Sequence, residues 1–220
     1  MSLRRLLAGT GLMCAFVFGV SGAMAQEHED HSGHDHAKGH DGDKAQDHAA
    51  EMEAWMAMAT PGPEHANLKY CVGEWKASLK HWMEPGAEPA VSVGKEVNTE
   101  ILGGRFVQTH FTGDFMGSPF EGHGYIGYDR IKKKYVSTWI DCMGTQVMMQ
   151  WGDYDAATKT YTFLNEMTKP DGTPMKGQMI DKITGPDTHV MTMYHEMDGK
   201  MVKAMEISYE RAGNASAMAE

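Results

Sequence analysis

Hydrophobic and polar residues alternate along almost the whole chain after Gly73, which is the pattern of β-strands that bury one face. The alternating runs are short and follow one another closely. They are 74–83, 92–102, 105–112, 119–128, 135–142, 146–153, 160–167, 174–184, 188–197 and 201–210. No interval between them is long enough for a crossover helix, so strands adjacent in sequence are predicted to pair antiparallel.

Turn-forming residues separate these runs. The sequence KPDGT at 169–173 and the pair Asp198-Gly199 are strong hairpin signals. Further breaks are expected at Pro85-Gly86, Gly103-Gly104 and Gly113-Asp114. The strands should therefore form a meander joined by tight turns.

A meander of about ten strands must hide the edges of its sheet. Closure into an up-and-down barrel hides them completely, and eight strands already enclose space for one small ligand. The sequence therefore predicts an all-β fold, an antiparallel up-and-down barrel of about ten strands. A flattened sandwich of two sheets is the alternative.

One or two short helices are expected before the barrel. Apolar residues recur at helical spacing in 51–59, and TPGP then ends the pattern. A second short helix should begin at Pro63, a residue suited to the first helical position, and end before Gly73. These elements occupy 51–73, and the barrel occupies 74–211.

The first 25 residues have the features of a secretory signal peptide. Arg4 and Arg5 precede an apolar stretch too short for an ordinary transmembrane helix, and Ala23-Met24-Ala25 fits a cleavage site. Cleavage after Ala25 would release a periplasmic or secreted protein with no stable membrane anchor. The net charge of −10 makes nucleic acid a poor candidate partner.

Residues 26–50 have almost nothing to bury and are expected to be disordered, as is the tail at 212–220. Histidines among carboxylates are typical of metal-binding tracts, and imidazole suits zinc and copper. The alternative is a solubilising leader without a specific role. The candidate metal ligands are His28, His31, His34, His36, His40 and His48.

Two cysteines, Cys71 and Cys142, remain after signal cleavage. An oxidising compartment permits a disulfide between them. The sequence leaves this possible disulfide and two free thiols equally open, because it does not say whether the two backbone positions come close enough.

Several segments resemble the bacterial domain-of-unknown-function 1579 family, and the resemblance spans about 52–211. The segments that carry it include VGEWK, LGGRF, GSPFEGHGYIGYD, KKYVSTWIDCMGT and MEISYER. The resemblance implies a calycin-like barrel, the class of lipocalins and fatty-acid-binding proteins, and it carries over no catalytic residue. Cysteine is unusual at positions 71 and 142 in that family, which favours their pairing. The histidine-rich segment lies outside the resemblance.

The run DTHVMTMYHEM at 187–197 places histidine and methionine on one face of a strand, namely His189, Met191, Met193, His195 and Met197. Thioether and imidazole together could bind Cu(I). Packing of the methionines against the barrel wall or cavity is the favoured interpretation.

Four further residues are candidates for a ligand site. His110 and His123 could point into the cavity as polar anchors or haem ligands, although exposed or hydrogen-bonded strand positions are more common for histidine. Arg105 could pair with a buried carboxylate near the barrel mouth or lie at the surface. Trp139, like the other strand tryptophans Trp75, Trp82 and Trp151, is expected in the core, with Trp75 at the barrel floor. Glycines within FEGHGYIGYD indicate a sharp bend or a close backbone approach.

No enzyme motif is found in the sequence, which has no GxSxG, HExxH, CxxC or phosphate-binding glycine loop. The leading hypothesis is an exported barrel that binds a small apolar molecule without transforming it, with an accessory histidine-rich segment that binds zinc or copper. One alternative is a periplasmic protein that handles copper or zinc. A further alternative is an unrecognised enzyme, for example a haem-dependent one.

Overall fold

The computed structural model describes residues 41–213 of the chain. The chain divides into two compact units, Met1–Lys44 and Ala45–Glu220, and the first is described only by the opening residues of one helix. The second unit contains the rest of that helix, a second helix and the barrel.

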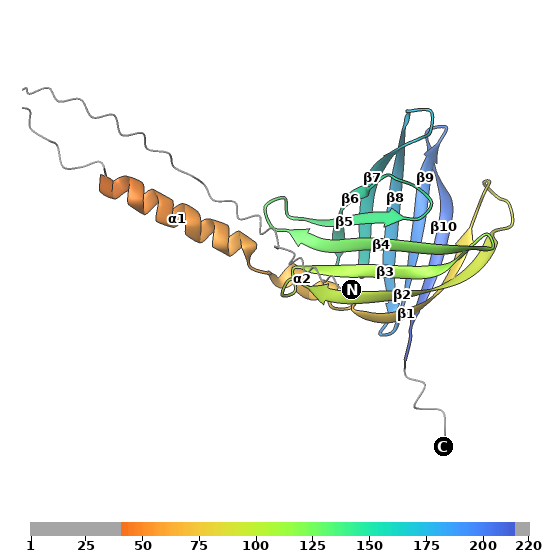
Figure 1. Ribbon diagram of the computed structural model, residues 1–220, viewed down its shortest axis with the longest axis horizontal. Coiled ribbons are helices and arrows are strands. Elements are labelled where there is room, and N and C mark those ends of the chain that lie inside the picture. The colour runs from red at the N-terminus through yellow and green to blue at the C-terminus, as the bar shows by residue number, and fades with distance from the viewer. Residues whose placement is uncertain (1–40, 214–220) are drawn as a thin grey trace, which may run out of the picture. The chain divides into compact units, whose positions relative to one another are not determined.

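Ten strands form one closed antiparallel barrel, shown in Figure 1. The strands are β1 (Gly73–His81), β2 (Ala90–Ile101), β3 (Phe106–Phe115), β4 (Ser118–Asp129), β5 (Lys134–Asp141), β6 (Met148–Asp155), β7 (Thr160–Thr168), β8 (Pro174–Gly185), β9 (Thr188–Met197) and β10 (Lys200–Arg211). Each strand pairs with its neighbours in sequence, and β1 pairs with β10 to close the barrel. The predicted all-β barrel is confirmed, and the two-sheet alternative is wrong.

Two helices precede the barrel, α1 (Asp41–Ala59) and α2 (Pro63–Leu68). Pro63 begins α2 as expected, whereas α1 begins at Asp41 rather than at residue 51. Alanine, lysine, glutamine and glutamate dominate 44–53 and favour helix, so the end of the segment expected to be disordered is helical. Neither described helix is both long and apolar enough to cross a membrane.

One predicted turn is wrong. Strand β3 continues through Gly113-Asp114 to Phe115, and Met116-Gly117 form the two-residue turn to β4. Both turn residues have positive φ, 54° and 82°, as a type I′ hairpin requires. The Asp114 carboxylate accepts a hydrogen bond from the Gly117 backbone N–H at 2.8 Å. Methionine is an unusual residue at positive φ, so the sequence signal was weak.

The inward face of the sheet follows from strand β1, where Trp75, Ala77 and Leu79 are buried and the residues between them are exposed. The strand register carries this alternation around the barrel. Ala77 lies opposite Tyr209 of β10, and Tyr209 lies opposite His189 of β9. The His/Met face of β9 therefore points into the barrel.

One end of the barrel is closed by residues 63–72. Leu68 of α2 belongs to a buried cluster with Tyr161 and Phe163, and the Tyr70 hydroxyl donates hydrogen bonds to two backbone oxygens of the β8–β9 turn. Trp75 is completely buried, as predicted for the floor. We call this the closed end, and the opposite rim, at the β3–β4 and β9–β10 turns, the open end.

Two of the tryptophans do not lie in the core. Trp151 of β6 faces outward, with the Lys132 ammonium 3.9 Å from its ring centroid. Trp82 follows β1 at the open end, where the Lys203 ammonium lies 4.7 Å from its ring centroid. In both cases a lysine covers the apolar ring at the surface.

Candidate ligand-binding site

Methionine side chains line the inward face of the open half of the barrel. Met193 of β9 lies opposite Met205 of β10 and Met179 of β8. Met193 and Met205 face inward and are partly buried, whereas Met179 is buried against the core. The inner wall of the open half is therefore apolar and incompletely covered by neighbouring side chains.

Trp139 of β5 forms part of the same wall. It lies opposite Gly124, and a Cβ atom at Gly122 or Gly124 would collide with the indole ring. The indole N–H donates a hydrogen bond to the Asp141 carboxylate at 2.9 Å, which fixes the ring in place. The strand glycines thus serve a close approach, one of the two roles expected for them.

A small group of amides adds polarity to the wall. The Asn165 side-chain N–H donates to the Gln150 side-chain oxygen at 3.3 Å, and the Gln150 amide approaches the Ser137 hydroxyl at 3.4 Å. The Asn165 side-chain oxygen is buried and has no hydrogen-bond partner. An unpaired buried acceptor is costly, so this atom is suited to accept a hydrogen bond from a bound molecule or water.

Two histidines lie at the open end. His81 and His195, together with Trp82 and Met197, line a pocket of about 210 Å³. Burial lowers the pKa of both imidazoles, and the neighbouring His81 lowers the pKa of His195 further. Both rings are therefore neutral at pH 7, which keeps this part of the rim compatible with an apolar molecule.

A second polar cluster is enclosed near the closed end, and sequence reasoning missed it. Burial raises the pKa of Glu96, while its hydrogen bonds with Asn98 (2.6 Å) and Tyr209 oppose the shift. His189 stacks on Tyr209 and hydrogen-bonds the Asp181 carboxylate at 2.8 Å. The alternation of Glu96 and Asn98 on one face of β2 was the only available signal, because their partners come from distant strands.

The seven residues predicted to bind ligand fall into two groups. Trp139, Met191, Met193 and His195 line the barrel interior, as the preceding contacts show. Met191 packs against both buried clusters, so it joins them on the inner wall.

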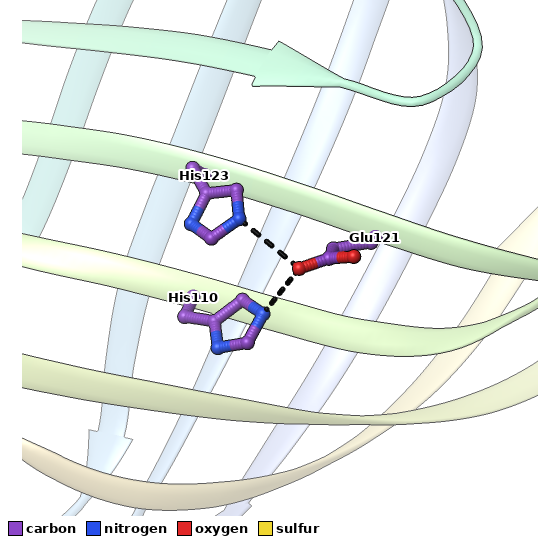
Figure 2. Close-up of side chains that lie close together, drawn as sticks. All are labelled: His110, Glu121 and His123. Carbon is purple, nitrogen blue, oxygen red and sulfur yellow. Dashed lines mark hydrogen bonds and ion pairs between the residues drawn. The ribbon is translucent and has the colours of Figure 1, made fainter. Parts of the chain in front are cut away.

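The other three residues lie elsewhere. Arg105 donates hydrogen bonds to the Ala59 and Leu102 carbonyl oxygens, and these contacts fit the surface role rather than the alternative pairing with a buried carboxylate. His110 and His123 point outward from β3 and β4 (Figure 2), so they cannot hold a haem inside the barrel. The period of a strand places residues on two faces but does not determine which face points inward.

The proposed disulfide is not formed, because Cys71 and Cys142 are both free thiols. Cys71 follows α2 at the closed end, whereas Cys142 follows β5 at the open end. The Cys142 backbone N–H donates a hydrogen bond to the backbone carbonyl oxygen of Glu121. The length of a strand separates them. Burial raises the pKa of the Cys71 thiol, so this cysteine is unreactive at neutral pH.

The histidine-rich segment lies largely outside the described residues. His28, His31, His34, His36 and His40 precede residue 41, as does the expected signal peptide. His48 lies on α1, exposed, with its ring nitrogen 4.0 Å from the Glu51 carboxylate.

Two solved structures with some likeness to this chain are Rv2717c and a phycobiliprotein lyase, and only the first exceeds a TM-score of 0.5. Rv2717c from M. tuberculosis matches with a TM-score of 0.52 and 12% identity over 70% of this chain and 100% of that one. The S-type phycobiliprotein lyase CPES from Guillardia theta matches with a TM-score of 0.43 and 11% identity over 70% of this chain and 99% of that one. At such identities the likeness concerns the fold alone.

Sequence comparison identifies the family. A search of curated proteins finds no match. The family described as "Protein of unknown function (DUF1579)" matches residues 60–211, which include α2 and the whole barrel. The chain therefore belongs to the DUF1579 family, and its domain is a closed ten-stranded antiparallel barrel.

Proposed function

We propose that the open half of the barrel binds a small, mainly apolar molecule and does not transform it. The observation that carries this proposal is the apolar inner wall of the open half. Met193, Met205 and Trp139 face inward there, pack on the core clusters and are only partly buried. A soluble barrel that leaves thioether and indole surface accessible gains free energy when an apolar molecule covers that surface.

The chemistry of the wall suits an elongated or flat apolar molecule with one polar group. Methionine side chains adapt to irregular shapes because they are unbranched and polarizable. Neutral His195 and the unpaired Asn165 oxygen supply the few polar contacts that would orient the ligand. The ligand would therefore contain a hydrogen-bond donor.

Variants of two matched methionines test the proposal. Met193→Glu places a carboxylate on the inner wall, and Met149→Glu places the same group on the outer face of β6, where Met149 is 51% exposed. We expect Met193→Glu to weaken binding of a neutral fluorescent probe, N-phenyl-1-naphthylamine, by about tenfold or more, because the new carboxylate would have to be desolvated when the probe binds. Met149→Glu should bind as the unmodified protein does.

Extraction of the native protein followed by mass spectrometry would identify a molecule carried from the cell. Circular dichroism checks that the variants fold. If Met193→Glu does not fold, the milder Met193→Gln replaces it. Equal probe binding by the inner and outer variants would contradict the proposal, because the probe would then bind outside the barrel.

A further inference from the structure

Two histidines and a glutamate meet on the outside of the barrel. His110 of β3 and His123 of β4 are direct cross-strand partners, and Glu121 lies two residues before His123 on the same outward face. Directly opposed side chains of an antiparallel pair lie within contact distance. The hairpin turn at Met116-Gly117 fixes this register, so the three side chains are brought together by the fold of one hairpin.

Two imidazole nitrogens and one carboxylate oxygen of these side chains lie close together, as Figure 2 shows. The Nε2 atoms of His110 and His123 lie 3.0 and 3.2 Å from the same Glu121 oxygen, Oε1. The imidazole rings are stacked, with centroids 4.5 Å apart and planes inclined by 4°. The three ligand atoms lie within 4.8 Å of one another.

We propose that His110, Glu121 and His123 form a binding site for a divalent transition-metal ion such as Zn²⁺ or Cu²⁺. Two ligands that are each about 2.1 Å from a tetrahedral ion lie about 3.4 Å apart. The two nitrogen–oxygen separations are already close to this spacing, so small side-chain rotations would admit the ion. Two imidazoles and one carboxylate are a donor set that zinc and copper accept.

Binding an ion requires a rearrangement of protons that this site permits. Each Nε2 must offer a lone pair to the metal, so the ring proton must reside on Nδ1. The side chains of His110, Glu121 and His123 are 43%, 58% and 40% exposed, so water can hydrogen-bond the Nδ1–H groups and occupy the remaining coordination position. This exposure also implies a modest affinity, since no rigid buried shell orients the rings.

An ordinary surface ion pair explains the arrangement less well. Exposed ion pairs contribute little to stability, and one carboxylate oxygen needs only one imidazole to form such a pair. The neighbouring cation on β2, Lys95, forms its 2.8 Å ion pair with Glu74 instead of competing for Glu121. Within residues 46–213, the Glu121 carboxylate therefore pairs with both histidines and with no lysine or arginine.

Zinc titration of the full mature chain tests this site. The parent protein should carry glutamine at the six histidines of residues 26–50, so that only His65 of α2 and the barrel histidines remain to bind. The six changes are His28→Gln, His31→Gln, His34→Gln, His36→Gln, His40→Gln and His48→Gln. We expect calorimetry to detect a single Zn²⁺ per chain, and His110→Gln, His123→Gln or Glu121→Gln to weaken that binding by about tenfold or more.

The matched control is Glu210→Gln, which removes the same charge from an exposed position on the outer face of β10. It should bind Zn²⁺ as the parent does. Electron paramagnetic resonance of added Cu²⁺ supplies a second readout, since coupling to imidazole nitrogen should be lost in His110→Gln and His123→Gln. Unaltered thermal melting shows that these surface variants fold.

Equal Zn²⁺ affinity of the parent, the three site variants and the control would overturn the inference, as would the absence of Zn²⁺ binding by the parent. The site faces away from the barrel interior, so it does not depend on the proposed apolar ligand. Probe binding by Met193→Glu and zinc binding by Glu121→Gln therefore fail or succeed independently.

Discussion

Aromatic rings in this barrel lie directly over glycines of neighbouring strands. Trp139 covers Gly122 and Gly124, and Phe163 covers Gly152, its direct partner on β6. The missing side chain leaves room for the ring to lie flat on the sheet instead of filling the barrel centre. These rings therefore cover the inner face of the sheet at positions where the strand has no side chain.

Gly122→Ala should disturb this arrangement. The added Cβ would collide with the Trp139 ring, which the Asp141 hydrogen bond holds in place, and such overpacking costs about 1–3 kcal/mol. Urea unfolding should therefore show a lower free energy of unfolding. Gly144→Ala is the control, because a Cβ at Gly144 meets open space. Equal stability of the two variants would show that Trp139 is free to move.

Strand faces could be predicted at the residue scale, but their orientation could not. Period-two alternation placed His189, Met191, Met193 and His195 on one face, and the structure confirms that they share it. Whether that face points inward depends on the register with β8 and β10, which no local pattern encodes. The buried partners of Glu96 escaped prediction for the same reason.

At the scale of elements, the misplaced β3–β4 turn concealed the histidine–glutamate cluster. A turn at Gly113-Asp114 would set His110 opposite Gly117, whereas the turn at Met116-Gly117 sets it opposite His123. Hairpins with standard turn residues were predicted correctly, as Asp198-Gly199 shows with φ values of 51° and 73°. Turn position thus determined whether a surface site could be foreseen.

The link between α2 and the barrel depends on Arg211 at the end of β10. Its guanidinium donates hydrogen bonds to the Val72 and Tyr70 carbonyl oxygens at 2.8 and 2.9 Å and to the Asp187 carboxylate at 2.9 Å. The same group lies 4.1 Å from the Trp75 ring centroid. One side chain therefore joins the closing segment, the β8–β9 turn and the barrel floor.

Arg211→Ala should weaken the closed end. The variant loses several hydrogen bonds from a charged donor and leaves two part-buried carbonyl oxygens unpaired, which should lower the free energy of unfolding by about 3 kcal/mol. Lys76→Ala, at an exposed position of β1, should change it by less than about 0.5 kcal/mol. Chemical denaturation measures both, and a similar small effect of the two changes would contradict the role assigned to Arg211.

At the scale of the whole molecule, both ends of the barrel bury titratable side chains and thereby shift their pKa values. The closed end buries Glu96 and raises its pKa, and it also lowers the pKa of His65 by burial. The open end holds His81 and His195 neutral in the same way. Three partly buried histidines therefore resist protonation in the folded protein.

The contribution of these three histidines to stability should consequently fall as the pH drops below about 6.5, the pKa of unperturbed histidine, whereas the raised pKa of Glu96 acts in the opposite direction. Below that value the unfolded chain binds protons that His65, His81 and His195 do not yet bind in the folded state, so the free energy of unfolding decreases until the pH passes their lowered pKa values. Urea unfolding at about pH 7.5 and about pH 5.5 measures this loss.

The double variant His81→Gln/His195→Gln should lose less stability between the two pH values, whereas His48→Gln, on the exposed helix α1, should behave as the unmodified protein does. An identical pH dependence in the double variant would mean that the two rim histidines titrate freely, and that the open end is more hydrated than its inward-facing methionines indicate.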